Sequence, residues 1–232
     1  MNKKTKTVGI LGGMGPYATL FFFQRLLEID VVKKDWEHIH IVIDNNTGIP
    51  SRSRHFLYGE ESPVYKMIDS CLRLEKYPVD FIVIPCNSAS FFLSDIQKKI
   101  KIPILDIMKI TVKALVEKYP QASSVAVLGG IVTYENQTYL QYLQAEGIKF
   151  IQHGREIQNK INWLIEQIKL NHIEEIVDEF GNLINIFEGK YNVDVIILGC
   201  TEFACFKDFN CKIKLIDSSF ELAKYTVSFA KQ

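Results

Sequence analysis

Two of the five cysteines in this chain stand at equivalent places, each directly after a run of apolar residues. Cys86 ends the run FIVIPC, and Cys200 ends the run VIILGC. A free thiol ionises at about pH 8.5, so it can exchange a proton close to neutral pH. Two thiols on opposite sides of one carbon atom can remove a proton from one face and deliver a proton to the other. The pair therefore indicates acid–base chemistry that inverts a stereocentre.

The runs that carry these cysteines belong to a larger internal repeat. Three short runs of the first half recur in the second half, in the same order and at nearly the same offset. The pairs are VGILGG at 8–13 with VAVLGG at 125–130, FIVIPC at 81–86 with VIILGC at 195–200, and IPILD at 102–106 with IKLID at 213–217. One such pair arises easily by chance, but three in register favour two similar halves related by a pseudo-two-fold axis.

The elements that must position the thiols follow from the same pattern. Apolar runs alternate with stretches of helical periodicity, which predicts an α/β fold with mostly parallel strands. We expect two lobes, residues 1–110 and 111–232, each with a mostly parallel four-stranded sheet flanked by helices, facing one cleft. The expected strands include 8–12, 39–44, 81–85, 125–129 and 193–198. The expected helices are 17–32, 63–76, one that ends at about 100, one that begins at about 133, 156–169, 173–188 and 218–231. The last of these is a candidate to pack back on the first lobe.

Ligands of parallel α/β sheets bind outside the carboxyl ends of the strands, and both cysteines occupy that position. Asn87 and Ser88 follow the first cysteine. Thr201 and Glu202 follow the second. These small polar residues are expected to open helices, whose N-termini carry partial positive charge and favour a thiolate. Two lobes that face each other would then place the two thiols on opposite sides of one cleft.

The other cysteines and the composition exclude several classes of function. Cys71 lies in a helical stretch and is interpreted as core, while Cys205 and Cys211 lack the spacing and the histidines of a zinc site. Lys+Arg and Asp+Glu each number 27, a balance that argues against nucleic-acid or membrane-surface partners. The glycines at 12–15 do not match a dinucleotide fingerprint, and no phosphate loop is present. We expect a cytoplasmic protein with no metal and no cofactor.

Four motifs along the chain resemble those of the aspartate/glutamate racemase family. They are GILGGMGPYAT at 9–19, IPSR at 49–52, PCNSAS at 85–90 and GCTEF at 199–203. The resemblance implies catalysis by Cys86 and Cys200 without pyridoxal phosphate, a small amino-acid substrate and a homodimer. It also implies a set of substrate-binding residues: Met14, Arg52, Asn87, Ser88, Thr133, Lys169, Thr201 and Glu202. Of these, Arg52 is the first candidate for the distal carboxylate of the substrate and Lys169 the second.

The chain departs from the family pattern at several positions: Gly48 stands where glutamine is usual, Ser51 replaces aspartate, Gly129 replaces alanine, Ser88 and Gly130 replace threonine, and Ser90 replaces histidine. Because both thiols are kept, we expect racemisation of an acidic amino acid, aspartate before glutamate, with a bulkier substrate as the alternative. Two other functions stay open: a catalytically silent ligand-binding protein on the same scaffold, and an isomerase or decarboxylase that needs only one thiol.

Overall fold

The computed structural model describes residues 5–206 and 209–232. The strands form two four-stranded sheets, of order β2-β1-β3-β4 and β6-β5-β7-β8, and all pairings within them are parallel. The strands of the first sheet are β1 (Val8–Gly12), β2 (Ile41–Asn45), β3 (Phe81–Val83) and β4 (Ile104–Leu105). Those of the second are β5 (Ser124–Gly129), β6 (Lys149–Phe150), β7 (Val195–Gly199) and β8 (Lys214–Asp217).

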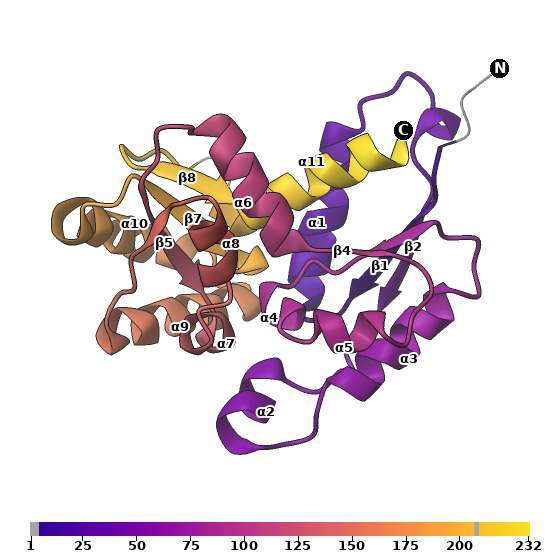
Figure 1. The fold of residues 1–232 in the computed structure, drawn as a ribbon, viewed down its shortest axis with the longest axis horizontal. Helices are drawn as coiled ribbons and strands as arrows, with labels where there is room; N and C mark the ends of the chain where they lie inside the picture. Colours follow the sequence, from indigo (N-terminus) through magenta and orange to yellow (C-terminus); the bar gives the residue numbers. More distant parts are fainter. Residues whose placement is uncertain (1–4, 207–208) are drawn as a thin grey trace.

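The repeated sequence runs occupy matching places in the two sheets (Figure 1). In each sheet the glycine-ended run forms the second strand, the cysteine-ended run forms the third, and the aspartate-ended run forms the fourth. The central strands β1, β3 and β7 are buried along their whole length, as parallel strands are when helices cover both faces. The predicted α/β class with two similar lobes of four parallel strands is confirmed.

Helices pack on both faces of each sheet. They are α1 (Pro16–Ile29), α2 (Arg52–Tyr58), α3 (Val64–Leu74), α4 (Asn87–Ser90), α5 (Leu93–Gln97), α6 (Ile107–Lys118), α7 (Ile131–Glu135), α8 (Leu140–Ala145), α9 (Arg155–Lys169), α10 (Val177–Ile186) and α11 (Ser218–Ala230). Helices α3, α4 and α5 pack on the first sheet, where Met67 and Ile96 share a core with Ile82. Helices α9 and α10 pack on the second sheet, where Ile161 and Phe180 share a core with Ala126.

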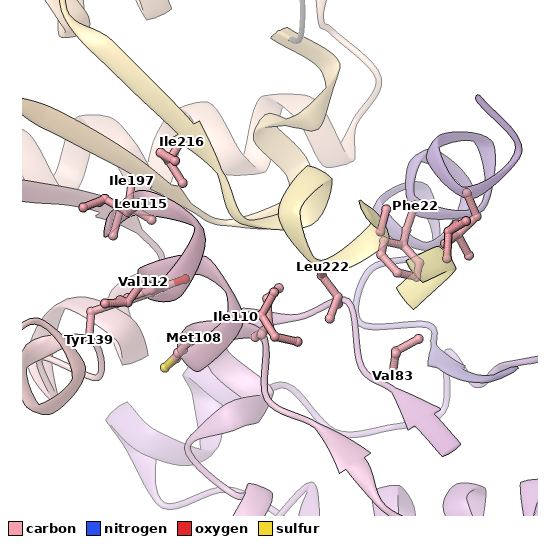
Figure 2. Close-up of a cluster of buried hydrophobic side chains, with 14 of the residues drawn as sticks. Phe22, Val83, Met108, Ile110, Val112, Leu115, Tyr139, Ile197, Ile216 and Leu222 are labelled. Atoms are coloured by element: carbon pink, nitrogen blue, oxygen red, sulfur yellow. The ribbon is translucent and has the colours of Figure 1, made fainter. Parts of the chain in front are cut away.

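The inner faces of the two sheets share one apolar core, which α6 and α11 fill (Figures 1 and 2). Figure 2 shows Val83 of the first sheet and Ile197 of the second in this cluster, with Ile110 of α6 and Leu222 of α11 between them. The limit predicted between residues 110 and 111 falls inside α6, so the connection between the lobes is a packed helix. The division into domains at that residue stays a prediction.

The third repeated pair explains where these two central helices begin. Asp106 caps α6, with its carboxylate accepting a hydrogen bond from the Met108 N–H at 2.9 Å. Asp217 caps α11 in the same way, accepting from the Ser219 N–H at 2.8 Å. Such a cap contributes about 0.5 to 2 kcal/mol. These aspartates therefore serve the fold in both lobes.

The last helix runs back along the first lobe. Helix α11 packs against α1 and α6 (Figure 1). Near its end the Ala230 carbonyl accepts a hydrogen bond from the Lys6 N–H at 2.8 Å. The Phe229 ring meets the Phe81 ring of β3 edge to face, with 4.9 Å between the centroids. The C-terminus thereby joins the core of the lobe in which the chain begins.

Several elements differ from the sequence prediction. The helix predicted to run to about 100 is divided into α4 and α5, because Phe92 turns the chain at φ −99°, ψ 1° and buries its ring. The helix predicted from about 133 ends at residue 135, and Gln137 follows in the left-handed region at φ 46°. Neither α2 nor β6 was predicted. Within 5–206 and 209–232, no helix combines the length and the apolar content that crossing a membrane requires.

Candidate active site

A cavity of about 360 Å³ lies between the lobes, at the carboxyl ends of the central strands. Four of its lining residues come just after the four central strands: Met14 after β1, Cys86 after β3, Gly130 after β5 and Cys200 after β7. The same edge of both sheets therefore builds one site. Of the residues predicted for the site, the lining includes both thiols and Met14, Arg52, Asn87, Ser88, Lys169, Thr201 and Glu202.

Thr133 is the one predicted site residue that does not line this cavity. It is buried in α7 and packs against the end of β5, so close that a Cβ atom on Gly129 would lie 2.6 Å from its methyl group. In the first lobe Thr19 packs in the same way under Gly12, and its hydroxyl accepts a hydrogen bond from the Gly13 N–H at 3.0 Å. Thr133 thus packs against the turn that follows β5 and supports it.

The two thiols differ in their surroundings. The Cys86 side chain is buried, and its residue is the N-cap of α4. The Cys200 thiol donates a hydrogen bond to the carboxylate of Glu202, with 2.9 Å between Sγ and Oε2. Burial raises the pKa of Cys200 well above its ordinary value, the Glu202 charge adds to that increase, and Lys169 opposes it.

The expectation that its position favours a thiolate is therefore wrong for Cys200. Residues Thr201–Phe206 form a 3-10 helix instead of an α-helix, and Glu202, itself buried, places a negative charge beside the sulfur. Burial and this charge both disfavour ionisation. Both effects favour the neutral thiol form of Cys200.

Cationic side chains line the cavity. Arg52 donates from Nη2 to the Met14 carbonyl at 2.8 Å and from Nη1 to the Pro50 carbonyl at 3.2 Å. Its Nε is buried and has no hydrogen-bond partner within the described part of the chain. Lys169, at the end of α9, lines the same cavity. A cavity lined by a buried donor of this kind and by a second cation is a suitable place for a carboxylate.

Sequence reasoning missed several residues that line the cavity. Arg54 and Tyr58, both of α2, line it. Asn162 and Glu166 line it from α9, two turns and one turn before Lys169, respectively. The helical spacing of these two residues from Lys169 was the signal that could have identified them.

The departures from the family pattern separate into two groups. Ser51, Ser88 and Gly130 line the cavity, whereas Gly48 does not, and Ser90 lines a different cavity. Ser51 is the N-cap of α2, accepting a hydrogen bond from the Arg54 N–H at 3.3 Å, so it keeps the capping ability of the aspartate it replaces. Gly48 and Ser90 therefore lie outside the cavity that holds the two thiols.

No group of three or more His, Cys, Asp or Glu side chains that could hold a metal ion occurs within 5–206 and 209–232. Cys205 and Cys211 do not line the cavity of the thiols, and pack, partly buried, against the apolar core to which α10 contributes Phe180. Burial raises the pKa of Cys205 to about 12.

Comparison with known proteins gives this geometry a family. The model of the family described as Asp/Glu/Hydantoin racemase matches residues 11–225. A broad specificity amino-acid racemase, RacX, of Bacillus subtilis is 32% identical over 227 residues, covering 95% of this chain and 96% of that protein. A glutamate racemase of Haemophilus influenzae is 26% identical over 216 residues, covering 90% of this chain and 73% of that protein.

The solved structures agree with the sequence relatives. The aspartate racemase of Picrophilus torridus superposes with a TM-score of 0.85 at 27% identity, covering 97% of this chain and 94% of that one. The match therefore extends over both sheets. The chain is thus an amino-acid racemase by its relatives, and it belongs to the Asp/Glu/Hydantoin racemase family.

Proposed function

We propose that this racemase interconverts the enantiomers of a small acidic amino acid, aspartate before glutamate, by moving the Cα proton between Cys86 and Cys200. One observation carries the proposal: both thiols line a single cavity from two different lobes, each at the carboxyl end of the third strand of its sheet. Racemisation needs a base on one face of Cα and an acid on the other, and this arrangement supplies both.

The proton balance follows from the state of the thiols. With Cys200 neutral, Cys86 acts first as the base: its thiolate takes the Cα proton, and the electron pair spreads into the substrate carboxylate. The Cys200 thiol then protonates the other face of Cα, which leaves Cys200 as thiolate and Cys86 as thiol. The reverse reaction exchanges the two roles. Return of each thiol to its starting state exchanges a proton with water.

The preference for an acidic substrate rests on charge. Arg52 offers a buried Nε that no described residue pairs with, and Lys169 adds a second positive charge to the same cavity. A side-chain carboxylate would satisfy that donor through a charge-assisted hydrogen bond. The Picrophilus torridus relative is an aspartate racemase, which agrees with this preference.

A bulkier or neutral amino acid is the second candidate, and a specific feature favours it. Gly130 leaves open space in the wall, since a Cβ atom there would meet only the Ser88 hydroxyl, at 3.7 Å. The relative from Bacillus subtilis is a broad specificity racemase. Chiral chromatography over a panel of pure enantiomers separates the two candidates: no turnover of aspartate or glutamate, with turnover of larger amino acids, contradicts the acidic substrate.

The two-thiol mechanism has its own test. Cys86→Ala and Cys200→Ala should each abolish racemisation, while Cys205→Ala, which changes a free thiol outside the cavity, should leave it intact. In deuterated water the wild type should place deuterium at Cα of the product enantiomer. Racemisation near the wild-type rate by either of the first two variants contradicts the mechanism. The homodimer stays a prediction, which light scattering can check.

A further inference from the structure

The residues beside the two cysteines bond across the boundary between the lobes. Thr201, directly after Cys200, donates from Oγ1 to the Pro85 carbonyl at 3.0 Å. Asn87, directly after Cys86, donates from Nδ2 to the Ser218 hydroxyl at 3.0 Å. Pro85 and Asn87 flank Cys86, so the backbone that carries this thiol is attached to the second lobe on both sides.

A buried tyrosine completes this arrangement. Tyr139 precedes α8 in the second lobe, is 1% exposed, and donates its hydroxyl proton to Oδ1 of Asn87. Burial raises the pKa of the Tyr139 hydroxyl, so the hydroxyl keeps the proton that it donates. Ser218 donates its own proton to the Leu198 carbonyl at 2.7 Å, which leaves its oxygen free to accept from Asn87.

These contacts define the orientation of the Asn87 amide. Its carbonyl oxygen must face the tyrosine, which donates, and its amino group must face the serine, which accepts. One amino hydrogen remains for the cavity, which Asn87 also lines. Without the tyrosine hydroxyl the buried oxygen would lose its donor, and the amide could rotate.

We propose that Tyr139 and Ser218 are positioning residues, which hold Asn87, and through it the Cys86 thiol, in register with Cys200 across the cavity. The inference rests on the proposed two-thiol mechanism. It matters because the second proton transfer must be completed before the first thiol returns its proton. A displacement of about 1 Å in such a site costs about a hundredfold in rate.

Tyr139→Phe tests the role with the removal of a single oxygen atom. We expect kcat to fall by about ten- to a hundredfold in both directions, with a smaller change in KM. Tyr142→Phe is the matched control: Tyr142 also bonds across the lobes, donating to Asp106, but it lies outside the cavity of the thiols. This control should lose some stability in urea unfolding and keep its kcat.

Deuterium partition distinguishes positioning from support of the fold. When reprotonation is slowed, the first thiol has time to exchange with solvent, so deuterium should also enter the recovered substrate. We expect this fraction to rise in Tyr139→Phe and in Ser218→Ala, relative to the wild type and to Tyr142→Phe. A loss of stability alone leaves the fraction unchanged.

The outcomes separate the two proposals. A folded wild type that racemises no amino acid refutes the proposed function. If the wild type racemises, and Tyr139→Phe matches Tyr142→Phe in kcat and in deuterium partition, the positioning role is refuted. The role is equally refuted if the loss of activity in Tyr139→Phe and in Ser218→Ala is fully accounted for by the fraction of each variant that is unfolded.

Discussion

Gly130→Thr restores the residue usual in the family and should make the protein both more stable and more selective. Gly130 is the N-cap of α7, with φ −64° and ψ 170°, a backbone conformation that threonine adopts without strain. No side chain now caps this helix. A Cβ atom would contact only the Ser88 hydroxyl, at 3.7 Å, which is ordinary van der Waals contact.

The size of the effect follows from these numbers. Replacing glycine where the new residue fits stabilises by about 0.4 to 1 kcal/mol, because the unfolded chain loses freedom. A threonine cap adds a few tenths of a kcal/mol. The sum is about 1 kcal/mol, or a rise in Tm of about 2 to 4 °C for a chain of this length. The added side chain also narrows the cavity, so KM should rise for bulky amino acids more than for aspartate.

Gly154→Thr is the matched control for that experiment. Gly154 is the N-cap of α9 with nearly the same backbone angles, φ −77° and ψ 168°, and a Cβ atom there would meet nothing. It lies outside the cavity, so this variant should gain similar stability without a change in substrate range. Thermal unfolding and the enantiomer panel measure both effects. A loss of stability in Gly130→Thr, or the same KM values as in Gly154→Thr, refutes the reasoning.

Other perturbations test the electrostatics and the packing. Glu202→Gln removes the charge that helps to raise the pKa of Cys200, so alkylation of that thiol should begin at lower pH. An alkylation rate that depends on pH as in the wild type contradicts this. Cys71→Ala should lower the free energy of unfolding by about 1 kcal/mol without affecting kcat. Because burial raises the pKa of Cys71 to about 12, this thiol should resist alkylation in the native wild type, which peptide mapping can show. Gly13→Ala should cost more than about 1 kcal/mol in urea unfolding, since φ is +88° and a Cβ atom would lie 2.3 Å from the Asn46 backbone. Dialysis against a chelator should leave racemisation intact. A loss of activity that added zinc or magnesium restores would contradict the two-thiol mechanism.

The sequence was sufficient for the fold class and for most of the cavity lining because both depend on a short-range pattern repeated twice. Apolar runs ending at Gly12, Cys86, Gly129 and Cys200 set the strand ends, and parallel topology then brings those ends together. The ionisation state of Cys200 was beyond such reasoning. It depends on burial and on the rotamer of its neighbouring carboxylate, which no spacing in the sequence encodes.

Contacts between distant segments were equally hidden. Tyr139 and Asn87 are far apart in sequence, and their hydrogen bond exists only once α6 has brought the lobes together. Thr133 was predicted in the correct helix, but the direction of its side chain depends on how that helix packs against Gly129. Helix α2 carries no long apolar stripe, so periodicity alone could not predict it.

The core shared through α6 and α11 has a consequence for how the molecule comes apart. Val8 of one sheet and Val125 of the other are buried in the same cluster, so separating the sheets would expose the apolar faces of both. Neither half of the duplicated sequence has a complete interior of its own. Unfolding should therefore be a single cooperative event, with the slowest-exchanging amides of β1 and β5 opening at the same free energy. A destabilising substitution anywhere in the shared core would then reduce the population of both thiol environments together, even when it lies far from the cavity.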